Sequence, residues 1–310
     1  MSYADEVFIK NCKDILENGV WDTDRDVRPH WEDGAPAHTI KKFGIVNRYD
    51  LQQEFPIMTL RRQYFKSAVD ELLWIWQKKS NNVHDLGSHV WDQWADENGS
   101  IGKAYGYQIA QRFRHHKFNT DGMVMREIWD YIDLMKQRYP SFRVDSATYE
   151  SVCKDQIDAV LYDLKHNPAS RRILTNIYNF DDLSEMALYP CAYSMTFNVS
   201  GETLNAILNQ RSQDMLAANG WNVMQYAALL MMVAQASGLK AGELVHVIAD
   251  CHIYDRHVPM VEKLIAAEAY DAPKVTLDPT VTDFYAFTKD SFKLEGYKYS
   301  SFDEKIPVAV

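Results

Sequence analysis

Cysteine is scarce in this chain of 310 residues, which has only four. They are scattered, with no CxxC pair and no zinc-like spacing, so the sequence predicts neither a disulfide framework nor a bound metal. Residues 1–17 carry acidic side chains and read as an amphipathic helix, not as a secretion signal. We therefore expect a reducing, cytoplasmic setting. The four are Cys12, Cys153, Cys191 and Cys251.

Positive charge is scarce as well. Lysine and arginine total 33 against 43 acidic residues, which gives a net charge of −10. This balance argues against a nucleic-acid surface, although it allows a small basic pocket for a phosphate group. No apolar run reaches the roughly 18 residues that a membrane-spanning helix needs. Hydrophobic residues still make up 46% of the chain, enough for a sizeable core.

The hydrophobic pattern predicts an α+β fold, with a mixed sheet flanked by helices. Residues 221–237 are apolar almost all round and predict one buried helix. No linker or repeat divides the chain, so we expect a single domain over 1–310, with a peripheral insertion near 109–150. The expected strands are 38–50, 172–178, 192–199, 203–210 and 244–249; the other expected helices are 64–79, 124–138, 147–165 and 257–268.

Cys191 follows a proline at the start of an expected strand, in the stretch ALYPCAYSM. A lone cysteine is most often a small buried hydrophobe, and a disulfide partner or metal ligand are further readings. A nucleophilic role needs cations that stabilise the thiolate. The adjacent pair Arg171 and Arg172 and the segment Gln210-Arg211-Ser212 supply such cations, or else a bidentate grip on phosphate.

Three further signals are weak when taken singly. Asn222 begins the apolar helix, where it either caps the helix or reads a base edge through its amide. His252 and Tyr254 share one strand face, which by itself indicates local hydrogen bonding more often than a site. Trp91 and Trp94 lie three residues apart and are more often core residues than a ligand platform.

Taken together and in order, these segments resemble the thymidylate synthase family nearly end to end. The chain is closest to the subgroup with a DVR…W…G.PAHT opening, here residues 26–39. The segments that carry the resemblance are DELLWIW (70–76), VWDQWADENGSIGKAYGYQ (90–108), SRRI (170–173), MALYPC (186–191), NQRSQDM (209–215), WNVMQYA (221–227), DCHIYDRH (250–257), DFYAFTKDSFKLEGY (283–297) and the final PVAV.

The resemblance implies an enzyme that makes dTMP and dihydrofolate from dUMP and 5,10-methylenetetrahydrofolate, without a metal. Cys191 would add to C6 of the uracil ring, so that C5 attacks the one-carbon unit and is then reduced by hydride from the folate. It also implies a homodimer packed through the sheets. Arg171 and Arg172 would reach the partner's site, and no membrane or nucleic acid is expected as a partner.

The resemblance also assigns roles to single residues. Arg28, Arg171, Arg172, Arg211 and Ser212 would bind the phosphate, with Gln210 in the same substrate-binding segment. Asn222 would read the uracil edge, where cytosine-using relatives carry aspartate. His252 and Tyr254 would bind the sugar hydroxyl. Glu71 and Tyr105 would serve proton transfer at the base, and Asp214, Trp91, Trp94 and the terminal Val310 would hold or enclose the folate.

The sequence departs from the family pattern at several positions, among them Ala192 after the cysteine and three pocket substitutions, Ala218, Gly220 and Ala249. The substitutions leave the last step open. A dUMP 5-hydroxymethylase, in which water captures the methylene intermediate, is the alternative activity. A nucleotide-binding protein without catalysis is the alternative from another class.

Overall fold

The computed structural model describes residues 1–117, 125–144 and 151–310. The chain groups into two compact units. Unit 1 comprises Met1–Leu72, Cys191–Tyr193 and Ser200–Val310; unit 2 comprises Leu73–Pro190 and Ser194–Val199. These units lie within what the sequence predicts as one catalytic domain, and that domain boundary stays a prediction.

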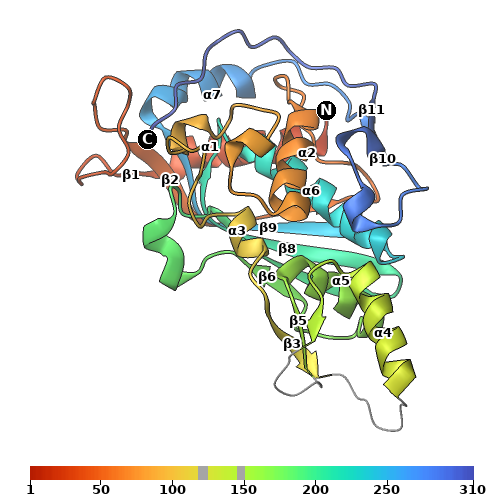
Figure 1. The fold of residues 1–310 in the computed structure, drawn as a ribbon. Coiled ribbons are helices and arrows are strands. Elements are labelled where there is room, and N and C mark those ends of the chain that lie inside the picture. Colours follow the sequence, from red (N-terminus) through yellow and green to blue (C-terminus); the bar gives the residue numbers. More distant parts are fainter. Residues whose placement is uncertain (118–124, 145–150) are drawn as a thin grey trace. The chain divides into compact units, whose positions relative to one another are not determined.

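Unit 1 is built on a mixed sheet (Figure 1). Its strands run in the order β1 (Val20–Trp21), β2 (Thr39–Asp50), β9 (Lys240–Tyr254) and β8 (Thr203–Asp214). Strand β2 is antiparallel to β9, whereas β8 is parallel to β9. The α+β fold with a mixed sheet is therefore confirmed.

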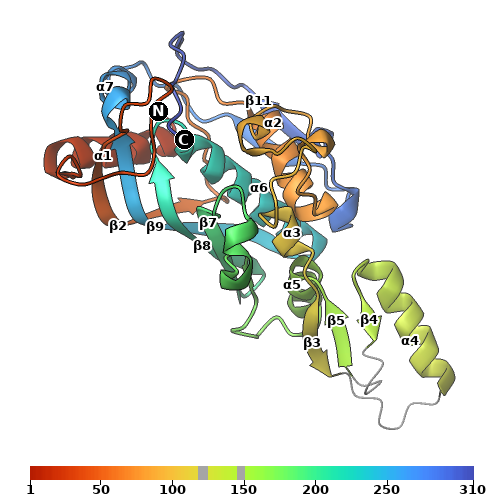
Figure 2. The ribbon, with the colours of Figure 1, turned by 60° about the vertical axis from the view of Figure 1, so that its left-hand side comes forward.

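Helices cover one face of this sheet. Helices α1 (Tyr3–Asn18), α6 (Asn219–Ala236) and α7 (Val258–Ile265) lie on the same side of β2, β9 and β8 in both views (Figures 1 and 2). Helix α6 buries most of its residues, so the buried apolar helix is confirmed. No helix among the described residues is long and apolar enough to span a membrane.

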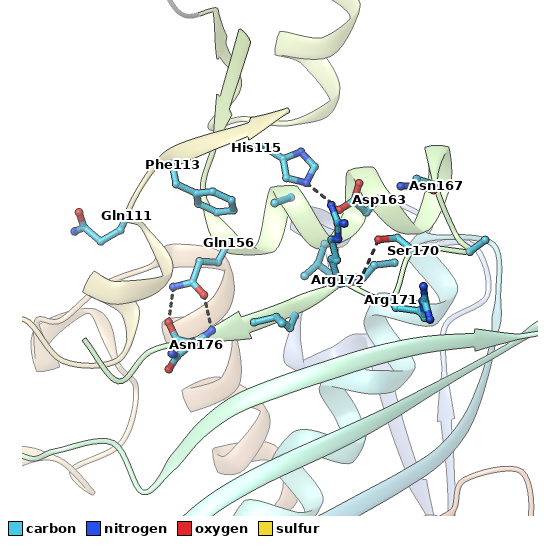
Figure 3. Close-up of a pocket in the computed structure, with 15 residues that line it drawn as sticks. Gln111, Phe113, His115, Gln156, Asp163, Asn167, Ser170, Arg171, Arg172 and Asn176 are labelled. Carbon is cyan, nitrogen blue, oxygen red and sulfur yellow. Dashed lines mark hydrogen bonds and ion pairs between the residues drawn. The ribbon is translucent and has the colours of Figure 1, made fainter. Parts of the chain in front are cut away.

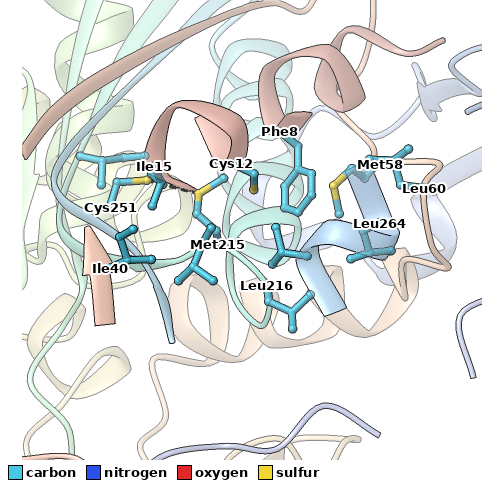
Figure 4. Close-up of a cluster of buried hydrophobic side chains, with 13 residues drawn as sticks. Phe8, Cys12, Ile15, Ile40, Met58, Leu60, Met215, Leu216, Cys251 and Leu264 are labelled. Atoms are coloured by element: carbon cyan, nitrogen blue, oxygen red, sulfur yellow. Dashed lines mark hydrogen bonds between the residues drawn. The ribbon is translucent and has the colours of Figure 1, made fainter. Parts of the chain in front are cut away.

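The core between these helices and the sheet draws on distant segments (Figure 4). Phe8 and Cys12 come from α1, Cys251 from β9 and Leu264 from α7, and each is at most 1% exposed. Met215 packs among them, with Cys251 Sγ 3.2 Å from its sulfur. Cys12 and Cys251 are thus structural thiols, which is the common role of a lone cysteine.

The remaining elements of unit 1 are α2 (Phe65–Leu73), which extends to the first residue of unit 2, and the hairpin of β10 (Lys274–Leu277) and β11 (Phe292–Glu295). Unit 2 contains a three-stranded antiparallel sheet in the order β3-β5-β4, and β6 pairs antiparallel with β7. Its elements are β3 (Phe113–Lys117), α3 (Gly106–Ile109), α4 (Met125–Arg138), β4 (Arg143–Val144), β5 (Ser151–Lys154), α5 (Gln156–His166), β6 (Leu174–Asn176) and β7 (Ala192–Ser200), the last shared between the units.

The expected helix over 147–165 is wrong in its first part. Residues 151–154 form strand β5, and the helix begins only after Asp155, whose carboxylate accepts from Asp158 N at 2.9 Å as an N-cap. Asp155 is a strong helix start signal that sequence periodicity alone overlooked. Residues 145–150 of that stretch, and 118–124 of the expected insertion, lie outside the described residues.

A buried carboxylate joins α1 to the loop before α2. Asp5 is fully buried and accepts hydrogen bonds from Thr59 N at 2.7 Å, from Thr59 Oγ1 and from Leu60 N at 3.3 Å. These donors have no access to water, so they depend on this one side chain.

Replacing Asp5 by alanine should lower the free energy of unfolding by about 3 kcal/mol, because it leaves buried donors without an acceptor. Urea unfolding measures the change. Asp14→Ala on the same helix is the matched control; it removes a half-exposed pair with Lys42 and should cost less than about 1 kcal/mol. Equal losses in the two variants would contradict the assignment.

Candidate active site

Cys191 lies beside a guanidinium group. The Arg211 backbone N–H donates to the Cys191 carbonyl at 2.9 Å, and Arg211 Nη2 is 3.7 Å from the thiol sulfur. Burial raises the pKa of the thiol, and the positive charges of Arg211 and Arg28 offset only part of that rise. Of the four arginines predicted to bind the phosphate, Arg211 and Arg28 thus also favour the thiolate of Cys191 within this chain.

A cavity of about 360 Å³ brings the phosphate-binding candidates together. Arg28, Arg211 and Ser212 line it with His252 and Tyr254, although these residues come from a loop, β8 and β9. The polar wall suits an anion with an attached hydroxyl-bearing group. The lining also includes Asp22, Val27, Pro29, Ala37, Thr39 and Asp250.

His252 and Tyr254 are held in place by neighbours on their own strand. His252 Nδ1 lies 2.8 Å from Asp250 Oδ1, an interaction that orients the ring. Burial would raise the pKa of Asp250, but hydrogen bonds from His252 and Lys41 outweigh it and lower the pKa. Burial raises the pKa of Tyr254 to about 12, so its hydroxyl stays a hydrogen-bond donor at neutral pH.

Gln210 and Asn222 are in direct contact. Gln210 Nε2 donates to Asn222 Oδ1 at 3.2 Å and to the Ser212 carbonyl at 2.9 Å. One turn further along α6, Tyr226 donates to the Ala192 carbonyl at 3.4 Å. Since residues four apart share a helix face, Asn222 lies on the face of α6 that is turned toward the Cys191 segment.

Glu71 is buried on α2, and Trp221 Nε1 donates to its carboxylate at 3.0 Å. This contact fixes the carboxylate to the first turn of α6. Trp221 is a residue that the sequence reasoning did not assign to the site; its position directly before Asn222 was the available signal.

Asp214 ends strand β8 and holds the turn before α6. Its Oδ1 accepts from Leu216 N and Ala217 N at 2.8 and 3.1 Å, and His257 Nδ1 lies 3.6 Å away. Burial would raise the pKa of Asp214, but the His257 charge and these hydrogen bonds lower it. The same pair raises the pKa of His257 against the effect of its burial.

The C-terminal residue docks on the loop that carries Arg28. His30 N donates to Val310 O at 2.8 Å, and Val310 N donates back to His30 O at 3.1 Å. On the same loop, Trp31 is buried. Its Nε1 donates to Asp255 Oδ1 at 3.0 Å, and its ring contacts Tyr254 edge to face. The C-terminal residue therefore contacts the segment that borders the cavity.

In unit 2, Trp91, Trp94 and Tyr105 form an aromatic cluster. The ring centroid of Trp91 lies 5.3 Å from that of Trp94 and 4.8 Å from that of Tyr105. Tyr105 has φ 47° and ψ −103°, a backbone conformation that is strained for a residue with a side chain. Strain of this kind is concentrated at functional sites.

Arg171 and Arg172 lie at a cavity of about 750 Å³ within unit 2 (Figure 3). Arg172 points toward Asp163 and His115 in this view, whereas Arg171 points away from them. Both arginines are exposed. Neither guanidinium has an ion pair or hydrogen bond to another described residue. They stand in a different unit from Cys191.

The comparisons with known proteins decide the family. The family described as thymidylate synthase matches residues 6–310. The chain belongs to the thymidylate synthase family. It is 40% identical over 303 residues to the thymidylate synthase of Bacillus mojavensis, with 96% of each chain covered, and 39% identical over the same length and shares to thymidylate synthase 1 of Bacillus subtilis strain 168.

A solved structure agrees with this assignment. The thermostable thymidylate synthase A of Bacillus subtilis covers all of both chains with a TM-score of 0.83 and 38% identity. The predicted family, fold and thymidylate synthase activity are confirmed, with methylenetetrahydrofolate as co-substrate. The roles of individual site residues stay predictions.

The pH at which iodoacetamide alkylates Cys191 should lie above that of an ordinary thiol, because burial raises its pKa and the thiolate is the reactive form. Arg28→Leu removes one of the positive charges that oppose this rise in pKa. It should therefore move the midpoint of the pH dependence of alkylation to still higher pH. Arg25→Leu, in the same loop beside Asp24, is the control and should leave the midpoint unchanged. A downward shift in Arg28→Leu would be inconsistent with this electrostatic role. Mass spectrometry of the labelled peptide gives the rates.

Proposed function

We propose that this thymidylate synthase methylates C5 of dUMP through a covalent bond between Cys191 Sγ and C6 of the ring. The observation that supports it most directly is the 3.7 Å separation of Cys191 Sγ and Arg211 Nη2, because a half-buried thiol needs a nearby cation to become nucleophilic. Addition at C6 makes C5 carbanion-like, and C5 attacks the one-carbon unit of methylenetetrahydrofolate. Loss of the C5 proton and hydride transfer from the folate then give dTMP and dihydrofolate.

We assign nucleotide binding to the cavity in unit 1. Arg28, Arg211 and Ser212 would hold the phosphate, and His252 with Tyr254 would bind the sugar hydroxyl. Their shared position on one polar wall supports this assignment. The Asp250 carboxylate in that wall is paired with Lys41 and hydrogen-bonded to the His252 ring, so it opposes a bound phosphate less than a free carboxylate would.

Proton transfer and folate binding are assigned to the remaining predicted residues. Glu71, oriented by Trp221, and the strained Tyr105 would serve proton transfer at the base. Trp91 and Trp94 offer aromatic surface for the folate, and Asp214 and Val310 would complete its binding. The contact of Val310 with the Arg28 loop supports a closing role for the terminus.

We infer that the active form is a homodimer packed through the sheets. The face of the unit 1 sheet that is turned away from the helices exposes apolar side chains, with Val46 at 54% and Ile207 at 41% exposure. Val247 and Val245 lie beside them in register. Exposed apolar surface of this kind is typical of an association face. Arg171 and Arg172, which are both exposed, would then complete the site of the partner.

The expected products distinguish the candidate activities. Incubating the wild-type protein with dUMP and methylenetetrahydrofolate should give dTMP and dihydrofolate, identified by chromatography and mass spectrometry. Cys191→Ala should abolish turnover while retaining nucleotide binding. Hydroxymethyl-dUMP with tetrahydrofolate would indicate the hydroxymethylase instead, and dUMP binding without any product would indicate a binding protein.

Mixed dimers test the role of the arginine pair. Cys191→Ala and Arg171→Ala/Arg172→Ala subunits should each be inactive alone. After dissociation and reassociation of an equal mixture, about a quarter of wild-type activity should return, because half of the dimers then contain one intact site made by both chains. No recovery would place the arginines in their own subunit's site. Reassociated wild-type protein controls for losses in the procedure.

A further inference from the structure

A buried histidine contacts Gln210, the residue that donates to Asn222. His246 on β9 is completely buried, and its Nε2 is 2.8 Å from Gln210 Oε1 on β8. Leu208 pairs with His246 and Gln210 pairs with Ile248, so His246 and Gln210 are diagonal neighbours on the helix-covered face of the sheet. Neither the family resemblance nor the reaction chemistry assigned this histidine a role.

The direction of each hydrogen bond in this group is determined by one carbonyl. The Ser212 carbonyl can only accept, so the Gln210 atom 2.9 Å from it is the amide nitrogen. The amide oxygen of Gln210 therefore faces His246, and His246 must carry its proton on Nε2. The same amide nitrogen donates to Asn222 Oδ1.

The other ring nitrogen agrees with this tautomer. His246 Nδ1 and Asn47 Nδ2 are both buried without a hydrogen-bond partner among the described residues. Asn47 stands directly opposite His246 in the β2–β9 register, and Asn11 donates to its Oδ1. A proton on Nδ1 would set two donors against each other, whereas a bare Nδ1 can accept from Asn47 directly or through one water.

We propose that His246 is a positioning residue for uracil recognition: its Nε2–H fixes the Gln210 amide, which in turn fixes the amide orientation of Asn222. With Oδ1 held toward Gln210, Asn222 Nδ2 is presented as a donor and the second lone pair of Oδ1 as an acceptor. Uracil offers an acceptor at O4 and a donor at N3, which this orientation matches.

Cytosine reverses both groups, since N4 donates and N3 accepts. Binding it would require Asn222 to turn over and set its NH2 group against that of Gln210. Gln210 could follow only by turning its own NH2 group toward the Nε2–H of His246. Through the amides of Gln210 and Asn222, His246 thus disfavours binding of the cytosine nucleotide without touching it. Burial lowers the pKa of His246 to about 3, so this neutral form persists across the range in which enzymes are assayed.

The test measures equilibrium binding of dUMP and dCMP without folate, together with kcat and KM for dUMP. His246→Leu should lower the ratio of dUMP to dCMP affinity about tenfold, the effect of one buried hydrogen bond, and should raise KM more than it changes kcat. His246→Gln retains a donor at the Nε2 position and should recover most of the ratio. Leu244→Val, buried on the same face two residues away, is the matched control and should leave the ratio unchanged.

Three results would each overturn the inference. The ratio of dUMP to dCMP affinity could stay unchanged in His246→Leu, or fall equally in Leu244→Val. The wild-type chain could also bind both nucleotides equally. A second measurement needs no variant. The nitrogen chemical shifts of His246 in the wild-type protein should identify the Nε2–H tautomer. An Nδ1–H tautomer would overturn the inference. The inference rests on the proposed binding of dUMP. Wild-type protein that prefers dUMP yet makes no dTMP would contradict the proposed function alone, because the binding ratios still decide the role of His246.

Discussion

The site in unit 1 depends on the pairing of Cys191 with Arg211. The Arg211 N–H holds the carbonyl of Cys191, and its guanidinium approaches the sulfur. Burial works against ionisation of the thiol, so a thiolate is favoured only where cations are close. A phosphate group bound in the cavity beside Arg28 and Arg211 would neutralise part of that positive charge.

Strand β8 carries several of the residues that surround this pair. Gln210 is buried beside His246, while the next two residues, Arg211 and Ser212, line the cavity. Asp214 then ends the strand and holds the turn into α6, the helix that carries Asn222. Residues 210–214 therefore place two side chains at the cavity, one amide against Asn222 and the turn that begins the buried helix.

Much of the secondary structure was predictable from the sequence, because neighbouring residues determine it. The apolar run of 221–237 predicted a buried helix, and the β-branched and aromatic residues of 38–50 predicted β2 to within a residue. The helix expected from residue 147 failed because strand β5 and helix α5 are contiguous, and the N-cap Asp155 marks a boundary that hydrophobic periodicity does not register. Motif order predicted the site residues, whose roles stay predictions, whereas neither hydrophobic period nor composition distinguished Cys191 from the structural thiols Cys12 and Cys251.

What the sequence could not provide is the set of contacts between side chains far apart in the chain. Glu71 and Trp221 are 150 residues apart, and His246 and Gln210 are separated by 36. A histidine in a β-strand is compatible with solvent, a metal or a core, and only the register of three strands shows that this one faces an amide oxygen. Specificity for a base edge depends on the direction of each donor, so it is fixed by such remote contacts as much as by the residue that touches the base.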